Sequence, residues 1–226
     1  MRSTLSSTRK TGLRRLKVLV TAGPTRERID PVRFISNYST GTFGYKIAEA
    51  AYRKNHHVTL ISGPVCRKSQ RGIRVVLVES AREMRAAVLR EFKKCDCLIM
   101  AAAVSDWRIK EEKKAKIKKN RAAQTLKLVE NPDILRESAL RKNGRIVVGF
   151  ALETERLEQN AIQKLKAKSL DLIVANKLTR NKNVFSDNKT SVLIVDKFGG
   201  KKYFCNKSKG KLANIILDKA LNLNIG

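Results

Sequence analysis

The sequence has no apolar run near the roughly 20 residues that a membrane-spanning helix needs, and its first residues lack the apolar core of a secretory signal. A cytoplasmic protein without membrane contact is therefore expected. Residues 1–15, MRSTLSSTRKTGLRR, contain no acid and little apolar surface, which predicts a basic disordered tail. A transit peptide is the alternative, because such presequences are rich in arginine and serine and poor in acids.

The usual patterns of metal sites and protein nucleophiles are also missing. The spacing of the cysteines fits neither paired zinc ligands nor a CxxC redox motif. We expect reduced thiols without special chemistry at all four positions, Cys66, Cys95, Cys97 and Cys205. The two histidines, His56 and His57, are expected in a loop or at a strand edge. With no Ser-His-Asp or Cys-His arrangement, hydrolysis through a protein nucleophile is not expected.

Acidic and aromatic residues are scarce. The chain has 20 Asp and Glu against 49 Lys and Arg, a net charge of +29, and only 5% aromatic residues. A field of this sign draws nucleotides and phosphorylated metabolites toward a cleft, and it keeps a nucleic-acid-binding module as an alternative function. Because the cations are spread along the chain without a recognition helix, an RNP-like strand or a zinc finger, nucleic acid is not the expected partner.

Apolar runs alternate with helical patterns after the first 15 residues. Strands are predicted at 16–22, 57–62, 73–78, 97–104, 125–129, 145–151 and 171–176, with a hairpin of 191–195 and 201–205. Helices are predicted at 43–54, 81–93, 155–168 and 209–221, with a further one opened by Asn131 as N-cap. Ser80 and Glu83 form a capping box before the second helix. The pattern predicts one α/β domain over 16–226, a Rossmann-like doubly wound, mostly parallel sheet with helices on both faces and a C-terminal β-hairpin.

Ligands of such sheets bind beyond the carboxyl ends of the strands, so the loops there carry most information. The first loop, GPTRERIDPVRFISNYSTGTFG, is long and ends in small residues at a predicted helix start, Ser39 to Gly44. A helix N-terminus of this kind suits a phosphate, although an ordinary capped helix explains it too. It is not a GxGxxG fingerprint, which argues against an NAD(P)-dependent reductase.

Two groups of cations accompany these loops. In the second loop, SDWRIKEEKKAKIKKNR, eight cations from Arg108 to Arg121 stand beside only Glu111 and Glu112, and as a flexible flap over the sheet edge the loop could close on a polyphosphate. A solvated charged surface is the alternative. Lys164 and Lys168 share one helix face, at a spacing that could grip a triphosphate or simply face solvent.

Seven motifs in order resemble one known family: VTAGPTRERIDPVRFISNYSTG, AAAVSDW, the KIKK of Lys116 to Lys119, LVENPDIL, VGFALET, KLKAKSLDLIVAN and FSDN. From about Lys17 onward the chain is similar to the phosphopantothenate-cysteine ligases, which in many bacteria form the C-terminal half of a bifunctional flavoprotein. The resemblance implies that 4'-phosphopantothenate attacks the α-phosphorus of a nucleotide and releases pyrophosphate. The amine of L-cysteine then displaces the nucleotide monophosphate. Mg²⁺ would shield the phosphates, and CTP, with ATP as the alternative, would be the co-substrate.

The resemblance also implies site residues, position by position. Catalytic roles fall on Asn37, which handles the acyl-nucleotide, and on Lys116, which neutralises growing phosphate charge. Substrate-binding positions are Arg33, Asn37, Ser39, Gly41, Ala102 and Ala103, with Arg33 and Ser39 near the pantothenate phosphate. Nucleotide-binding positions are Asp106, Lys116, Pro132, Asp133, Ile134, Leu135, Phe150, Lys164 and Lys168. No metal ligand is assigned.

The chain departs from the family pattern in two places. It has Thr42 where bacterial relatives commonly carry a lysine, which bears on phosphate affinity at that loop. It also lacks a flavin-dependent decarboxylase half, so no flavin is expected and another polypeptide would perform the following decarboxylation. Members of the family are dimers whose sites are completed across the interface, which makes a homodimer the expected assembly.

Overall fold

The computed structural model describes residues 15–119, 124–178 and 189–223. The predicted tail falls outside these ranges except for Arg15, whose Nε donates to the Asn55 carbonyl oxygen at 2.7 Å. None of the helices in these ranges is long and apolar enough to cross a membrane.

An eight-stranded sheet forms the centre of the molecule, in the order β12-β11-β10-β9-β6-β1-β4-β5. Six neighbouring strands are parallel: β10 (Leu172–Lys177), β9 (Ile146–Glu153), β6 (Cys97–Met100), β1 (Lys17–Ala22), β4 (His57–Ser62) and β5 (Arg74–Leu77). The edge beyond β10 is an antiparallel hairpin of β11 (Lys189–Asp196) and β12 (Lys201–Ser208). The mostly parallel sheet and the C-terminal hairpin confirm the prediction.

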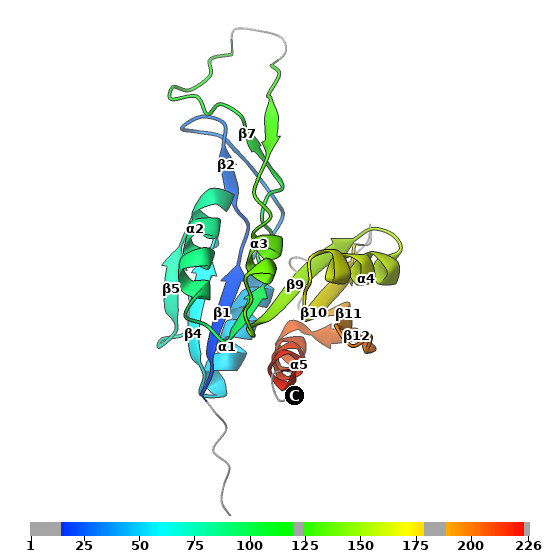
Figure 1. The fold of residues 1–226 in the computed structure, drawn as a ribbon. Coiled ribbons are helices and arrows are strands. Elements are labelled where there is room, and N and C mark those ends of the chain that lie inside the picture. The colour runs from blue at the N-terminus through cyan, green and yellow to red at the C-terminus, as the bar shows by residue number, and fades with distance from the viewer. Residues whose placement is uncertain (1–14, 120–123, 179–188, 224–226) are drawn as a thin grey trace, which may run out of the picture.

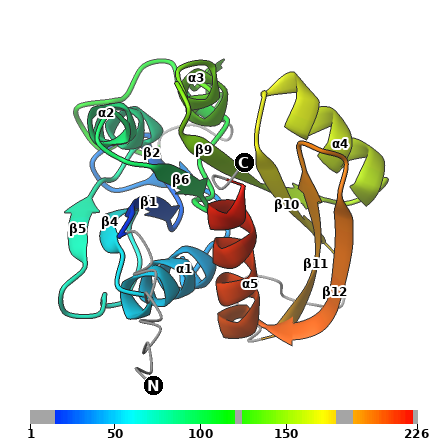
Figure 2. The same ribbon diagram turned by 60° about the horizontal axis from the view of Figure 1, so that its bottom comes forward.

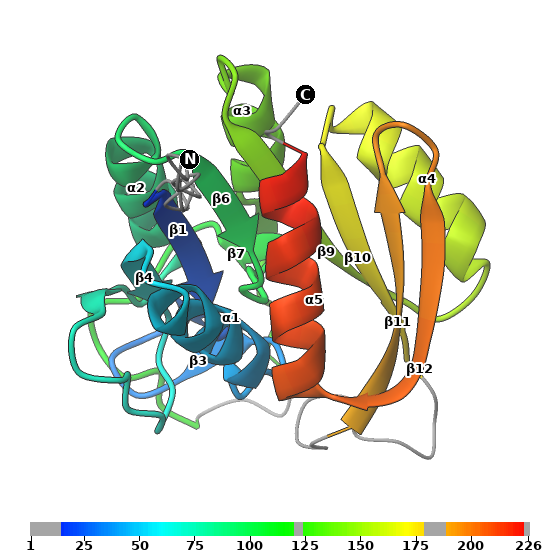
Figure 3. The same ribbon diagram turned by 90° about the horizontal axis from the view of Figure 1, so that it is seen from below.

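Helices cover both faces of the sheet (Figure 2). On one face lie α1 (Thr42–Arg53) and α5 (Lys209–Asn222), which pack side by side (Figure 3). On the other face lie α2 (Ala81–Phe92), α3 (Ile134–Leu140) and α4 (Leu157–Ala167). Each face has its own apolar core, and β1 contributes Val18 and Val20 to one and Leu19 to the other. Burying each such side chain stabilises the fold by about 1.5–3 kcal/mol, which gives the doubly wound architecture a rigid centre.

The two helix starts with a predicted cap differ in detail from expectation. At α2, Ser80 accepts the Glu83 N–H at 3.2 Å as predicted, but the Glu83 carboxylate accepts the N–H of Glu79 rather than that of Ser80. At α3 the prediction of Asn131 as N-cap is wrong. Asp133 caps this helix by accepting the Arg136 N–H at 3.0 Å. The helix begins two residues beyond Asn131, whose amide instead donates to the Ser105 carbonyl oxygen at 2.9 Å.

The strand predicted over 97–104 is too long, since β6 ends at Met100. The backbone beyond it turns to the loop after β1, where Ala102 N–H donates to Thr21 Oγ1 at 3.2 Å and Ala103 N–H donates to the Gly23 carbonyl oxygen at 2.9 Å. Ala103 thus forms only an isolated parallel bridge with Pro24, and β6 does not continue as a regular strand. An apolar run of alanines fits either environment, so sequence patterns could not separate them.

Two small hairpins lie outside the main sheet and are here named the arm. One is β2 (Arg26–Arg28) with β3 (Phe34–Ser36), inside the long first loop, and the sequence did not predict it. The other is β7 (Trp107–Ile109) with β8 (Leu128–Glu130), so the run predicted as a strand at 125–129 contributes to the arm and not to the central sheet. β2 packs against β7, and Figure 1 shows the arm extending beyond the main sheet.

Candidate active site

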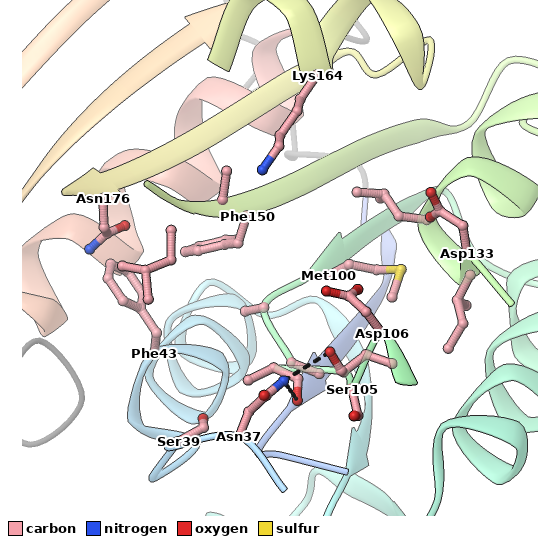
Figure 4. A pocket seen from close by; sticks show the side chains of 18 of the residues that line it. Asn37, Ser39, Phe43, Met100, Ser105, Asp106, Asp133, Phe150, Lys164 and Asn176 are labelled. Carbon is pink, nitrogen blue, oxygen red and sulfur yellow. Dashed lines mark hydrogen bonds between the residues drawn. The ribbon is translucent and has the colours of Figure 1, made fainter. Parts of the chain in front are cut away.

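A cavity of about 780 Å³ opens at the carboxyl ends of the central parallel strands. Its wall consists of residues 37–43, 100–107, 130–135 and 150–152, together with side chains from α4, β10 and the start of α5. In Figure 4, Asn37 and Ser39 lie along one side, Asp106 and Asp133 along another, and the Lys164 ammonium reaches in from α4. This is the sheet edge at which the sequence predicted a ligand site.

Backbone hydrogen bonds join the loop after β1 to the loop after β6. Besides the bond to Gly23, Ala103 accepts the Thr25 N–H at 3.3 Å, and Ser105 N–H donates to Thr25 Oγ1 at 2.9 Å. The Asn37 amide donates to the carbonyl oxygens of Val104 at 3.0 Å and Ala103 at 3.3 Å (Figure 4). With its amide nitrogen committed to the neighbouring loop, Asn37 is held in a fixed position on the cavity wall.

The start of α1 fits an anion. Gly41, the N-cap, has a φ of 70° and supplies no side-chain cap, and the first turn holds no acid to neutralise the positive end of the helix dipole. A Cβ on Gly44 would lie 2.5 Å from Ala22 Cβ and 2.7 Å from the Thr21 carbonyl oxygen, so only glycine lets α1 start directly against β1. The start of α1 therefore has the local geometry that the predicted phosphate site needs.

Sequence reasoning missed a cation, Arg67, that lies beside this helix start. The Arg67 guanidinium donates to Thr42 Oγ1 at 3.2 Å, from the loop that follows β4. It thus brings positive charge to the position where the sequence has threonine and not lysine. No signal in the sequence pairs residues 25 positions apart.

The opposite wall carries the two predicted lysines, Lys164 in α4 and Lys168 at its C-cap. Lys164 Nζ lies 2.6 Å from Glu153 Oε1, and Lys168 Nζ lies 2.9 Å from Asp133 Oδ2. Both side chains remain partly exposed to the cavity, so each could add a phosphate oxygen to its existing partner. Below them Phe150 meets Phe43 edge to face, with ring centroids 5.1 Å apart.

The cavity collects most of the predicted site residues. It is lined by Asn37, Ser39, Gly41, Ala102, Ala103, Asp106, Pro132, Asp133, Ile134, Leu135, Phe150, Lys164 and Lys168. Arg33 and Lys116 do not line it. They lie on the arm, where Arg33 pairs with Asp30 and donates to the Ile117 carbonyl oxygen at 3.0 Å. The predicted basic flap is thus part of the arm, and the FSDN motif lies outside the described residues.

Sequence reasoning also missed polar residues at the end of the cavity below α5. Asn176 is buried on β10 and donates to Thr190 Oγ1 at 3.2 Å, while the buried Lys209 begins α5. Both line the cavity. One comes from β10 and the other from the start of α5, and no local pattern shows that these two elements meet at one cavity.

The histidines lie at the start of a strand, as predicted, and the cysteines form no disulfide. All four cysteines are free, and burial raises the pKa of the Cys95 thiol to about 12, which leaves it protonated and unreactive. His57 begins β4, and the preceding His56 is buried, accepts the Leu16 N–H at 3.2 Å, and has its pKa lowered by burial. Within the ranges that the structure describes, no three His, Cys, Asp or Glu side chains cluster as metal ligands would.

Known proteins are similar to this chain in sequence. The chain is 43% identical over 208 residues to the coenzyme A biosynthesis bifunctional protein CoaBC of Bacillus subtilis (strain 168), covering 92% of this chain and 51% of that protein. It is 42% identical over 209 residues to a cysteine/cysteine sulfinic acid decarboxylase of an unknown prokaryotic organism, covering 92% of this chain and 58% of that one. The chain therefore spans about half the length of these curated relatives.

A solved structure extends the likeness to three dimensions. The fold is similar to the crystal structure of the C-terminal domain of the coenzyme A biosynthesis bifunctional protein CoaBC, with a TM-score of 0.80 and 33% identity over 93% of this chain and 97% of that one. The sequence pattern described as "DNA/pantothenate metabolism flavoprotein C-terminal domain" matches residues 13–223. The likeness extends over nearly all of the described chain, which belongs to the family of DNA/pantothenate metabolism flavoprotein C-terminal domains.

Proposed function

We propose that this chain is a phosphopantothenate-cysteine ligase, which joins 4'-phosphopantothenate to L-cysteine with CTP as co-substrate. The observation that carries the proposal is the cavity itself. It brings together a helix start without acids, two lysines from α4 and the fixed amide of Asn37. Its relatives' role in coenzyme A biosynthesis supports the choice of substrates.

The chemistry needs positioning and charge neutralisation more than a nucleophile from the protein. In the first step a carboxylate oxygen of the pantothenate bonds to the α-phosphorus, and the bond to pyrophosphate breaks. In the second, the cysteine amine bonds to the acyl carbon, loses a proton, and the nucleotide monophosphate leaves. Both steps move negative charge between oxygens, which hydrogen-bond donors and cations held in advance stabilise.

The walls of the cavity divide these tasks. Lys164 and Lys168, which line the cavity, would bind the triphosphate, while Ser39 and Gly41 at the α1 start would take the phosphate of the pantothenate. Asn37 lies beside this helix start and would hold the acyl-nucleotide for cysteine. Mg²⁺ arrives with the triphosphate as part of the substrate, and the exposed Asp106 carboxylate on the wall offers it an oxygen ligand.

The arm supports the proposal of a homodimer. It exposes several large apolar side chains, of which Trp107 is 48% and Phe34 is 45% exposed, together with Leu128. On the adjoining cavity wall Tyr38 is 86% exposed. Such a group of exposed apolar residues is typical of an interface. A second copy that covers these residues would bury them, and it would bring an arm with Arg33 and Lys116 toward a cavity that its own chain leaves without them. Sedimentation of the purified chain at micromolar concentration tests this directly.

The decisive experiment measures pyrophosphate release by the purified chain with Mg²⁺, 4'-phosphopantothenate and cysteine, in parallel with CTP and with ATP. Release that requires phosphopantothenate and is faster with CTP is the expected result. Faster release with ATP would keep the ligase and correct the nucleotide. No release with either, together with salt-dependent binding of DNA or RNA, would replace the ligase by the nucleic-acid-binding alternative.

A further inference from the structure

A fully buried carboxylate stands at the tip of the β2–β3 hairpin. The side chain of Asp30 has no exposed surface although the hairpin lies on the arm. Its Oδ1 accepts the N–H groups of Val32 and Arg33, both at 2.9 Å. Its Oδ2 accepts Arg33 Nε at 3.0 Å, Arg33 Nη2, and the Ile117 N–H at 3.1 Å. One oxygen therefore holds the turn, and the other holds a distant segment.

The distant segment carries Lys116. Ile117 is fixed through both of its backbone groups, because its carbonyl oxygen accepts Arg33 Nη2 at 3.0 Å while its N–H donates to Asp30. On the other side of Lys116, the Lys113 N–H donates to the Ile29 carbonyl oxygen at 3.0 Å. The backbone on both sides of Lys116 is thus attached to the β2–β3 turn.

The charges of Asp30 and Arg33 strengthen this attachment. Arg33 at hydrogen-bond distance, aided by the backbone N–H groups, holds the pKa of the Asp30 carboxyl well below its usual range. Asp30 is therefore ionised at neutral pH, and its bonds to the guanidinium are charge-assisted. Both bonds go to Ile117, which is 84 positions from Arg33 and 87 positions from Asp30. They therefore fix the loop to another part of the chain and do not serve the turn alone.

We propose that Asp30, through Arg33, is a positioning residue that fixes the Lys116 segment for the nucleotide-activating step. The inference rests on the proposed ligase function. Lys116 is the first residue of the cation-rich KIKK motif. If the loop were mobile, the Lys116 ammonium would have no defined position. A clamp on its backbone confines the ammonium before the substrate arrives, which is how positioning lowers a barrier.

The substitution Asp30→Asn separates the clamp from the turn. Asparagine retains one acceptor oxygen for Val32 and Arg33 N–H, but its amide NH₂ then faces the guanidinium and the Ile117 N–H, which are all donors. Asp196→Asn is the matched control. In the β11–β12 turn, Asp196 Oδ1 accepts the N–H groups of Phe198 and Gly200 at 3.0 and 2.9 Å, and no bond to a distant segment is involved.

The two half-reactions give the readout. For Asp30→Asn we expect phosphopantothenate-dependent pyrophosphate formation to fall about 10- to 100-fold, while cysteine transfer from supplied acyl-nucleotide stays within about twofold of the wild-type rate. Asp196→Asn should leave both rates unchanged. Equal loss in both half-reactions, or none in either, would contradict the positioning role. If Asp30→Asn fails to fold, Asp30→Glu, which keeps the charge, should show the same split with a smaller loss, and its absence would equally contradict the proposal.

Hydrogen exchange distinguishes a failure of this inference from a failure of the proposed function. Amide exchange of residues 113–119 should accelerate at least tenfold in Asp30→Asn and stay unchanged in Asp196→Asn, whether or not the chain is a ligase. An inactive wild-type protein with this exchange pattern would refute the ligase and leave the clamp in place. Unchanged exchange in Asp30→Asn would refute the clamp.

Discussion

The cavity wall and the arm hold their functional residues by different means. In the wall, two loops at the ends of β1 and β6 are joined by backbone hydrogen bonds, and α1 starts against β1 at Gly44, where no Cβ fits. In the arm, short hairpins leave large apolar side chains exposed, and a single buried carboxylate fastens the loop that carries Lys116. The wall is thus continuous with the core, whereas the arm depends on a few charged side chains.

This difference predicts how changes in each region act. A substitution in the wall disturbs core packing and the site together, because the loops after β1 and β6 line the cavity and continue directly from core strands. A substitution of an exposed side chain in the arm alters turnover with little effect on folding, because few buried contacts are lost there. The four predictions below test that separation.

The largest effect is expected in the arm, from Lys116→Ala. If Lys116 neutralises charge in the activating step, pyrophosphate formation should fall about 10²- to 10³-fold, as when one preorganised charge donor is removed elsewhere. The midpoint of thermal unfolding should not change, because the side chain is exposed. Lys114→Ala, at another exposed lysine of the same loop, is the control and should keep its rate. A wild-type rate in Lys116→Ala would remove the residue from the proposed site.

In the wall, Asn37→Asp should slow the transfer to cysteine by about 100-fold, which corresponds to about 2.7 kcal/mol in the activation free energy. The acyl-nucleotide should then accumulate. The amide donates to the carbonyl oxygens of Ala103 and Val104, and a carboxylate there repels both. Quenched-flow analysis would detect the intermediate. Asn214→Asp is the control, because its amide also donates to a backbone carbonyl, that of Gly210 in α5, and neither residue lines the cavity. Accumulation in both variants, or in neither, would contradict the assignment.

Gly44→Ala tests whether the wall is continuous with the core. The added Cβ would have to displace Ala22 or the Thr21 carbonyl, so the free energy of unfolding should fall by about 1–3 kcal/mol. Gly210→Ala is the matched control, because nothing lies within 4 Å of a Cβ at that position in α5, and alanine is the better helix former. Urea unfolding measures both. A stable Gly44→Ala variant would show that the α1 start can move.

The smallest effect concerns the pH dependence of the clamp. Arg33 lowers the native pKa of Asp30, so its stabilising contribution is present above the unfolded value of about 4 and is lost as pH falls toward the native pKa. The difference in unfolding midpoint between wild type and Asp30→Asn should therefore stay constant from pH 8 to 5 and shrink below about pH 4. Other acids titrate alike in both proteins and cancel. A difference that grows on acidification would reverse the assigned sign.

The sequence patterns predicted regular elements better than the connections between them. The buried strand β9 and the helix α2 follow directly from apolar runs and the serine cap at Ser80. The end of β6 at Met100 and the β2–β3 hairpin were not predictable, because alanines and short polar runs fit several backbones. Asn131 shows the same limit, since its amide serves the Ser105 carbonyl rather than the helix beside it.

For the candidate site, motifs fixed which residues to consider, and the fold decided where they lie. Asn37 and Lys164 belong to motifs far apart in sequence, yet they line one cavity because parallel strands end at one edge of the sheet. Lys116 belongs to an equally clear motif but lies on the arm, and Arg67 belongs to none although it reaches Thr42.

By itself, the sequence determined the α/β class, the order of most strands and helices along the chain, and the motifs that resemble a nucleotide-dependent ligase. These features depend on local periodicity and on residue identity, which a linear chain records fully. Only the tertiary structure decided that Asp30 is buried against Arg33 and Ile117, that Lys116 stands apart from the cavity, and that a guanidinium faces the α1 start. Those facts depend on contacts between residues tens of positions apart, whose free energy appears only once the backbone has folded.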